Sequence, residues 1–224
     1  MACNAGPDII EDGLVFCVDA ANINSYPKSG TTWSDLAGSN DGTMQSMSFA
    51  NYSPDNGGSL IFDGASDYVS LPENGMSYPN TNSDFTLEVI AKVNTFTPQY
   101  QVFFQQEDSG GTGRTWLGVS DFDTYYTFLG GSYLGATRTL SVNTVYHMIL
   151  KYDSGTLFLG LDGSWEHYST KSIDENSTGS FRIGSGKSTL HPVNGNIYSV
   201  KIYNRALTAD EVRQNYEATV GRFT

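Results

Sequence analysis

Paired carboxylates are the first side chains to look for, because two of them about 5 Å apart on one strand face can cleave a glycosidic bond. The clearest strand pattern, FTLEVIAKV, places Glu88 on one face, but Ile90 and Lys92 occupy the alternate positions where further acids would be required. Glu107 and Asp108 are adjacent, so their side chains diverge if the strand continues through them. The sequence therefore predicts no hydrolase activity.

Nucleophilic catalysis has no better support in the sequence. The three histidines are scattered, no G-x-S-x-G turn occurs, and Cys17 lies in an apolar strand pattern with no partner at a suggestive spacing. His147 alternates with Val145 and Ile149, which favours a structural histidine over a general base. Paired glycines are not followed by the helical pattern that a phosphate-binding loop needs. We therefore predict that the protein is not an enzyme.

The overall charge excludes several partners. The formal net charge is -12 and the sequence pI is about 4.4, so the surface repels phosphate backbones and anionic membrane faces. We expect no nucleic-acid partner, and no apolar run is long enough for membrane insertion. The start of the chain shows neither the basic residues nor the apolar core of a signal peptide, and Cys3 and Cys17 are both expected as free thiols. These features predict a protein made in the cytoplasm.

Aromatic residues, glycines and alternating patterns predict an all-β fold. The chain has 14 Tyr, 12 Phe and 24 Gly, and only 16% of its residues are charged. In FTLEVIAKV the apolar residues Phe85, Leu87 and Val89 share a dry face, while Thr86 and Glu88 mark a wet face. Such patterns recur with turn signals at the spacing of a sandwich or barrel, giving about ten to twelve strands.

Two segments refine this expectation. GLVFCVDA is expected to place Leu14, Phe16 and Val18 on one face of the first strand. The polar stretch at 20–58, rich in Asn, Ser, Gly and Asp, is expected to run over the surface as a long excursion. No internal repeat or long linker divides the chain, so one domain is the simpler prediction.

The end of the chain carries the one convincing helix signal. In LTADEVRQNYEA, Thr208 and Glu211 have the spacing of a reciprocal capping box, and Val212 and Tyr216 form a narrow apolar stripe. The pattern predicts a helix at about 208–217. Because a short helix with so narrow a stripe needs tertiary support, we expect it to cover the edge strand of a sheet.

Several motifs together resemble the concanavalin A-like lectin/glucanase superfamily in its laminin G-like branch. They are, in order, DGLVFCVDAANINSYPKSGTTWSDLAGSNDGTM, GSLIFDGASDYVSL, FTLEVIAKV, YHMILKYDSGTLFLGLDG and GNIYSVKIYNRALTADEVRQNY, and they extend from about residue 13 to 217. The resemblance implies a two-sheet antiparallel β-sandwich, or jelly roll, with one short C-terminal helix. It also implies a single domain at 13–224 after an N-terminal arm at 1–12, a possible attachment segment.

A narrower resemblance pairs the front motif with the final RALTADEVRQNYEATVGRF. Together they are similar to laminin G-like proteins of tailed bacteriophages, particularly those of marine bacteria and cyanobacteria. This implies a virion protein made in the host bacterial cytoplasm: a capsid decoration, head-fibre or tail-fibre component. Its partners would be other virion proteins, such as major capsid or tail proteins, and further copies of itself, with a trimer plausible. Fold alone does not decide between these roles.

Calcium is a cofactor that relatives of this type bind through loop-end oxygens. The candidate ligands here are Asp19 and Asn22, at the start of the long polar stretch, and Asp63 and Asp67, which flank GAS. A calcium ion needs six to eight converging oxygens. The alternative is that these residues cap turns, as Asp and Asn commonly do.

Aromatic residues could bind carbohydrate by stacking on sugar faces. The candidates lie in the half of the chain where relatives expose a concave sheet: Trp116, Tyr125, Tyr126, Tyr133 and Trp165. Trp33 is an outlying candidate in the long polar stretch. Core packing or a protein interface would use the same residue types.

Two functions follow from these expectations. The first is a non-enzymatic phage virion structural protein with possible binding to carbohydrate on a host surface. The alternative is a soluble, calcium-assisted carbohydrate-binding lectin module.

Overall fold

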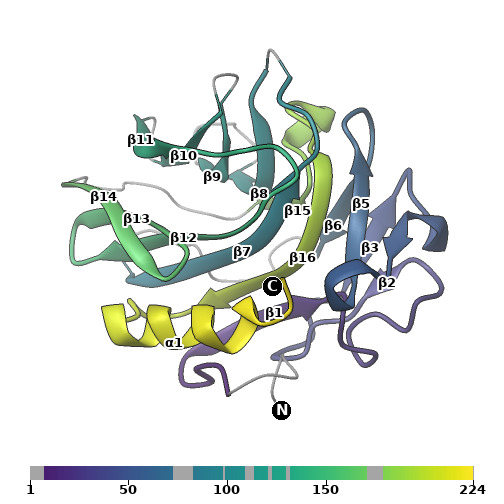
Figure 1. Cartoon of the computed structure of the whole chain (residues 1–224), viewed down its shortest axis with the longest axis horizontal. Coiled ribbons are helices and arrows are strands. Elements are labelled where there is room, and N and C mark those ends of the chain that lie inside the picture. Colours follow the sequence, from purple (N-terminus) through teal and green to yellow (C-terminus); the bar gives the residue numbers. More distant parts are fainter. Residues whose placement is uncertain are drawn as a thin grey trace.

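A computed structural model of the chain describes residues 8–72, 83–97, 99–108, 114–120, 123–129, 132–170 and 179–223. Over these residues two antiparallel sheets pack face to face, and one helix lies outside them (Figure 1). The predicted two-sheet antiparallel β-sandwich with one C-terminal helix is therefore confirmed. The described part of the chain contains no helix that is long and apolar enough to cross a bilayer.

Over the described residues each sheet has eight strands. The first sheet contains β1 (Leu14–Asp19), β4 (Tyr52–Ser53), β5 (Ser59–Asp63), β7 (Phe85–Val93), β12 (Val145–Asp153), β13 (Thr156–Leu161), β14 (Ser164–Thr170) and β16 (Asn194–Tyr203). The second sheet contains β2 (Thr32–Trp33), β3 (Gly42–Gln45), β6 (Tyr68–Leu71), β8 (Gln101–Asp108), β9 (Arg114–Val119), β10 (Thr124–Leu129), β11 (Ser132–Thr139) and β15 (Gly179–Ile183). The helix α1 is Ala209–Val220, and short 3-10 turns occupy Phe49–Asn51, Asp55–Gly57 and Lys187–Thr189.

The strand order interleaves distant parts of the sequence. The first sheet runs β14-β13-β12-β7-β16-β5-β4, and β1 also pairs with β16. The second sheet runs β11-β10-β9-β8-β15-β6-β3-β2. The end strands β11 and β14 lie side by side (Figure 1), where Arg138 of β11 forms an ion pair of 3.4 Å with Glu166 of β14. Both sheets therefore join early and late segments into one core.

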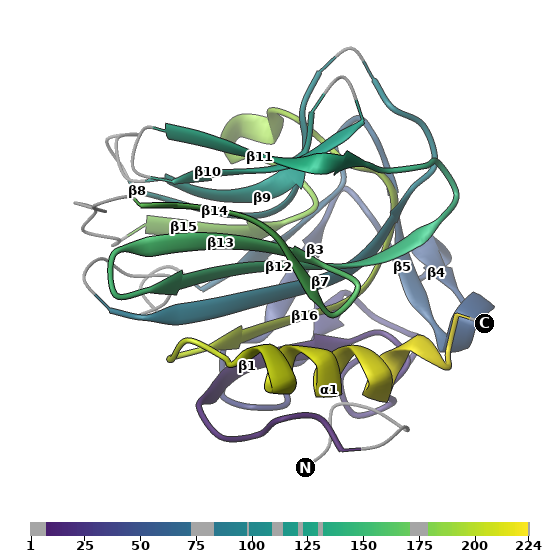
Figure 2. The same ribbon diagram turned by 60° about the vertical axis from the view of Figure 1, so that its left-hand side comes forward.

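One face of β7 packs in the core as predicted, and the opposite face is buried as well. Phe85, Leu87 and Val89 lie in the core between the sheets. On the opposite face Thr86 and Glu88 are also buried, so the predicted wet face is wrong at these two positions. The reason is tertiary, since α1 lies over this side of the first sheet (Figure 2).

The first strand departs from its predicted pattern at one position. Phe16 and Val18 point into the core as expected. A register shift between Leu14 and Phe16 turns Leu14 away, and it packs instead with the outer cluster that contains Cys17. Cys17 is disulfide-bonded, so the expected free thiol is wrong for this residue, while Cys3 lies outside the described residues.

The polar stretch at 20–58 is not only a surface excursion. It forms short strands in both sheets and contributes Tyr26, Trp33 and Met44 to the core. Trp33 is fully buried, which removes it as a candidate contact for sugar. The small polar residues between these anchors hid the core contribution in the sequence.

The capping box of α1 forms as predicted. The Thr208 hydroxyl accepts a hydrogen bond from the Glu211 backbone N–H at 3.3 Å, and the Glu211 carboxylate accepts from the Thr208 N–H at 2.8 Å. Val212 packs on Ile149 and Tyr203, residues of β12 and β16. The helix therefore lies across the outer face of the first sheet (Figures 1 and 2) and also contacts the end strand β14, so the expected cover of an edge strand describes part of its packing.

One buried amide ties the helix to the sheet and to the N-terminal arm. Asn215 donates to Glu88 at 2.9 Å and to the Tyr203 hydroxyl at 3.0 Å, and its side-chain oxygen accepts from the Ile10 N–H at 2.8 Å. The Tyr203 hydroxyl in turn donates to the Ile10 carbonyl at 3.0 Å. Gln214 adds a bond to the Asp8 carbonyl at 3.0 Å. Residues 8–12 are thus packed against the domain, and residues 1–7 of the predicted arm lie outside the described residues.

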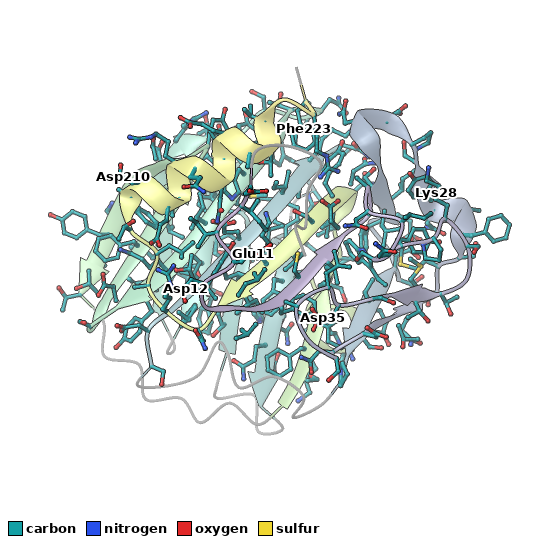
Figure 3. The ribbon with its side chains drawn as sticks, turned by 90° about the horizontal axis from the view of Figure 1, so that it is seen from below. Glu11, Asp12, Lys28, Asp35, Asp210 and Phe223 are labelled. Atoms are coloured by element: carbon teal, nitrogen blue, oxygen red, sulfur yellow. The ribbon has the colours of Figure 1, made fainter. Side chains whose placement is uncertain are left out.

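Figure 3 shows this underside of the molecule, with Glu11 and Asp12 beside the helix. Next to Asp12, the Arg205 guanidinium forms a two-bond pair with the Glu211 carboxylate, at 2.9 and 2.7 Å. Hydrogen bonding from Arg205 lowers the pKa of Glu211 from 4.5 to about 2, although partial burial acts in the opposite direction. The pair therefore stabilises the fold while Glu211 is ionised.

We expect Glu211→Gln to change how stability depends on pH. The folded-state pKa lies below the unfolded value, so this contribution is present above about pH 4.5 and is lost as the pH falls towards 2. At neutral pH the variant should lose about 1 kcal/mol, because glutamine keeps the capping oxygen but not the charge. Urea unfolding between pH 2 and 7 should show a shallower acid limb in the variant. The exposed Glu217→Gln serves as the control, and parallel curves for Glu211→Gln and wild type would contradict the assignment.

Candidate functional site

The outer face of the second sheet is rich in aromatic side chains. Leu117 of β9 and Tyr125 of β10 point into the core. Because side chains alternate along a strand, Trp116 and Tyr126 point away from it. Strand register places Phe128 opposite Trp116, on the same outer face. Two neighbouring strands thus present their aromatic residues on one side.

These residues belong to a cluster of six rings, which we call the aromatic cluster. Its members are Tyr100, Trp116, Tyr126, Phe128, Tyr133 and His191. The ring centroids of Tyr133 lie 4.7 Å from Phe128, 5.7 Å from Tyr100 and 5.9 Å from Tyr126. Trp116 continues the cluster, 5.5 Å from Phe128 and 5.4 Å from His191. Tilted and edge contacts of this kind stabilise aromatic groups.

The aromatic cluster has an exposed layer and a buried floor. Tyr133 is 54% exposed and Leu190, next to His191, is 57% exposed. Trp116 and Tyr126 lie beneath and are almost fully buried. The Tyr126 hydroxyl is buried without a hydrogen-bond partner among the described residues, and burial raises the pKa of this hydroxyl. A buried hydroxyl of this kind costs free energy unless a partner binds it.

Polar side chains border the aromatic cluster. Gln105 of β8 is the register partner of Trp116, and it donates to the Glu107 carboxylate while accepting from the Lys187 N–H. Among the described strand residues whose side chains lie on this face, Glu107 is the one with a carboxylate. Gln105 and Glu107 thus place an amide and a carboxylate beside the rings, where such groups can hydrogen-bond to the hydroxyls of a ligand.

The structure separates the five predicted carbohydrate contacts. Three of them, Trp116, Tyr126 and Tyr133, come together in the aromatic cluster. Tyr125 is buried in the core, where its hydroxyl donates to the Ile149 carbonyl at 2.6 Å. Trp165 lies on β14 of the first sheet. Tyr125 therefore belongs to the core and Trp165 to another surface.

Sequence reasoning missed three members of the aromatic cluster. Phe128 could have been found, because it is two residues after Tyr126 in TYYTFL and must share its face. Tyr100 and His191 lie outside the strands, and only the tertiary fold brings Tyr100 to Tyr133 and His191 to Trp116. No local signal identified them.

The predicted calcium ligands form two separate groups. Asp19 pairs in register with Ser199, and Asp63 with Asn194. These positions are five residues apart on β16, or roughly 16 Å at about 3.3 Å per residue. In the part of the chain that the structure describes, no three His, Cys, Asp or Glu side chains gather where they could hold a metal.

Each of these residues has a partner within the fold. Asp19 accepts from the Arg222 guanidinium at 2.9 and 3.1 Å, and the Asn22 side chain accepts from the Asn24 N–H. Asp63 accepts from three successive backbone N–H groups after it, and Asp67 accepts from Asn51 at 2.9 Å. Burial raises the pKa of Asp19, and Arg222 opposes the shift. The turn-capping alternative describes Asp63 well, while calcium binding stays a prediction.

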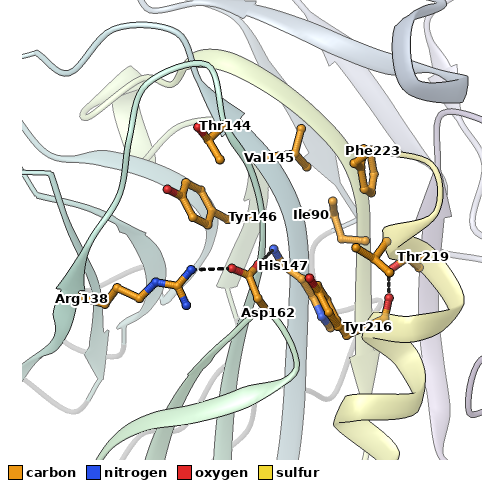
Figure 4. A pocket seen from close by; sticks show the side chains of 11 residues that line it. Ile90, Arg138, Thr144, Val145, Tyr146, His147, Asp162, Tyr216, Thr219 and Phe223 are labelled. Atoms are coloured by element: carbon orange, nitrogen blue, oxygen red, sulfur yellow. Dashed lines mark hydrogen bonds and ion pairs between the residues drawn. The ribbon is translucent and has the colours of Figure 1, made fainter.

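A pocket beside α1 is another candidate site (Figure 4). Its volume is about 200 Å³, and Tyr146, Asp162, Tyr216 and Phe223 are among the residues that line it. The Asp162 carboxylate is already paired: it lies 2.8 Å from the Arg138 guanidinium and accepts a hydrogen bond of 3.1 Å from the backbone N–H of His147. Typical ligand pockets span about 300–1,000 Å³. The aromatic cluster is therefore the stronger candidate.

A comparison with known protein families shows the family to which the chain belongs. The profile described as "Concanavalin A-like lectin/glucanases superfamily" matches residues 63–213. The chain belongs to this superfamily. A search of curated proteins found no match.

Two solved structures illustrate the fold that this chain shares with other proteins. Trypanosoma rangeli sialidase in complex with the inhibitor DANA is 16% identical, with a TM-score of 0.73 over 97% of this chain and 34% of the sialidase. The superfamily member thus spans about a third of the sialidase's length. Domain 4 of AbnA, an extracellular arabinanase from Geobacillus stearothermophilus, in complex with arabinotriose, is 16% identical, with a TM-score of 0.69 over 92% of this chain and 100% of that one. At these identities the likeness shows the fold.

Proposed function

We propose that this chain is a non-enzymatic carbohydrate-binding domain whose aromatic cluster stacks on sugar rings. One observation carries the proposal: six rings from separate segments converge on the outer face of the second sheet, with Tyr133 more than half exposed above them. A sugar ring has apolar C–H faces that pack on aromatic rings, and its hydroxyls need polar partners at the rim. The aromatic cluster and its polar border supply both.

Two further features support binding without cleavage or a metal. Glu107 is the carboxylate among the described strand residues of this face, whereas retaining and inverting glycosidases both use a pair. Asp19 is engaged by Arg222 rather than open to an ion. Stacking on the aromatic cluster would need no calcium ion at Asp19. The fold relative captured with arabinotriose makes pentose oligosaccharides a reasonable class to test first.

A glycan array followed by calorimetry tests the proposed function. We expect saturable binding to at least one oligosaccharide, with a Kd between about 1 μM and 1 mM, unchanged by EDTA and without release of reducing sugar. No binding up to about 10 mM ligand would overturn the proposal. Binding that EDTA abolishes would support the calcium-assisted lectin instead, with Asp63 and Asp67 as the first residues to substitute.

A place on a phage virion, as a decoration, head-fibre or tail-fibre component, stays a proposal that the motif resemblance supports. It is compatible with carbohydrate binding, because a displayed domain would contact host glycans from the particle surface. Quantitative proteomics of purified particles and of infected-cell lysate tests it. Enrichment with particles is expected, and presence in lysate alone would contradict a virion role.

A further inference from the structure

A second group of aromatic side chains lies on the outer face of the first sheet. Leu157 and Leu159 of β13 point into the core, so Phe158 between them points outward. Its register partner on β14 is Tyr168, and their ring centroids lie 5.9 Å apart. Trp165 lies on the other side of Phe158, at 5.6 Å. We call these three side chains the second aromatic group.

The second aromatic group is held in place from behind and open in front. Trp165 packs against the cluster formed by Val212 of α1 and Tyr203. Tyr168 is 70% exposed, the largest fraction among the exposed large hydrophobic side chains of the described residues. A rigid back and an exposed ring are the conditions for stacking on a ligand without a large loss of side-chain entropy.

The charges beside the second aromatic group are already paired. The Lys151 ammonium lies 4.2 Å from the Phe158 ring centroid and 4.8 Å from that of Trp165. It also forms an ion pair of 3.2 Å with Asp153. Among the described residues the Lys151 charge beside these rings is thus matched by Asp153, which favours a neutral ligand over an acidic or basic one.

We propose that the second aromatic group is a further carbohydrate-contact surface for neutral sugars. The proposal rests on the proposed function, because both surfaces would use stacking. A protein partner fits less well: aromatic side chains bury about 150–250 Å² each, so three rings, two of them already partly buried, provide less than the roughly 800 Å² per partner of a stable interface. A single sugar residue covers one ring and needs no more.

Two surfaces on opposite sheets would make one chain bivalent. The aromatic cluster faces outward from the second sheet, and the second aromatic group faces outward from the first. A polysaccharide, or a glycan-coated surface, would then be held at two points. Linked contacts raise the apparent affinity for a polymer well above that for a short oligosaccharide.

Calorimetry with Tyr168→Ala tests the inference. The probe is the uncharged oligosaccharide that binds wild-type protein most tightly on the glycan array. We expect two sites per chain in wild type and one in Tyr168→Ala, together with an affinity for the parent polysaccharide about tenfold weaker in the variant. Because Tyr168 is mostly exposed, the unfolding midpoint of the Tyr168→Ala variant should match that of the wild-type protein.

The control separates this inference from the proposed function. Tyr133→Ala should weaken binding at the aromatic cluster by about tenfold to thirtyfold and leave the affinity of the Tyr168 site unchanged. If Tyr133→Ala abolishes binding and Tyr168→Ala changes nothing, the second surface is refuted while the proposed function stands. If no oligosaccharide binds wild type, both fail. A wild-type dimer that dissociates in Tyr168→Ala during size-exclusion chromatography would also refute the carbohydrate assignment, in favour of a second copy.

Discussion

Glu88→Ala is expected to lower the free energy of unfolding by about 3–5 kcal/mol, the cost of removing one partner from a buried charge cluster. Glu88 is 1% exposed; its carboxylate lies 3.4 Å from His147 and 3.6 Å from the Lys201 ammonium. Burial alone raises the pKa of Glu88, but His147 and Lys201 outweigh it and hold the pKa below its usual value. Without Glu88, the buried Lys201 ammonium loses this ion pair and the Asn215 amide loses one of its hydrogen bonds.

The position of this cluster makes the effect reach the whole C-terminal face. Asn215 connects Glu88 to α1, and the same amide holds the Ile10 backbone. Loss of Glu88 should therefore loosen the helix and residues 8–12 together. Limited proteolysis is expected to cut both segments earlier in Glu88→Ala than in wild type.

Urea unfolding at neutral pH measures the energy, with two variants for comparison. Glu217→Ala removes an exposed carboxylate of the same helix, 3.7 Å from Arg213, and should cost less than about 1 kcal/mol. Glu88→Leu combined with Lys201→Met removes both charges and should be less destabilised than Glu88→Ala. A loss below about 1 kcal/mol for Glu88→Ala would mean that the charges are not desolvated as described.

Tyr133→Ala is expected to weaken oligosaccharide binding at the aromatic cluster by about tenfold to thirtyfold, or about 1.4–2 kcal/mol. Tyr133 is the exposed ring of the cluster, and it packs on Phe128 and Tyr126. Removing it takes away the ring on which a sugar would stack and leaves only the buried floor. Because Tyr133 is exposed, Tyr133→Ala should change the free energy of unfolding by less than about 1 kcal/mol.

Two substitutions make this result specific. Tyr133→Phe should retain most of the affinity, since the ring rather than the hydroxyl makes the stacking contact. Phe49→Ala removes another exposed aromatic ring, 65% exposed on a short 3-10 turn, and should leave binding unchanged. Equal losses in Tyr133→Ala and Phe49→Ala would point to a non-specific effect.

Local patterns in the sequence predicted the helix and most of the longer strands, although the described residues contain sixteen strands where about ten to twelve were expected. The alternation in 85–93 identified the core face of β7, and the Thr208 and Glu211 spacing identified the start of α1. These features depend on residues within a few positions of each other, where backbone geometry dictates the outcome. The helix ran three residues further than predicted because Ala218 and Thr219 are buried against the sheet.

Contacts between distant segments could not be predicted in the same way. Nothing local indicates that Arg222 meets Asp19 across 203 residues, or that α1 buries Glu88. The alternation in TYYTFL separates Tyr125 from Tyr126 but does not say which faces the core. Trp116 and Trp165 looked equivalent in sequence, and only strand order places them on opposite sheets.

The central claim is that the outer face of the second sheet binds carbohydrate. Titration of isotope-labelled protein with the best oligosaccharide, followed by NMR chemical shifts, tests it most directly. We expect saturable chemical-shift changes that are largest at Phe128, Tyr133 and Leu190. Saturable shifts confined to the pocket beside α1, with those three residues unchanged, would contradict it.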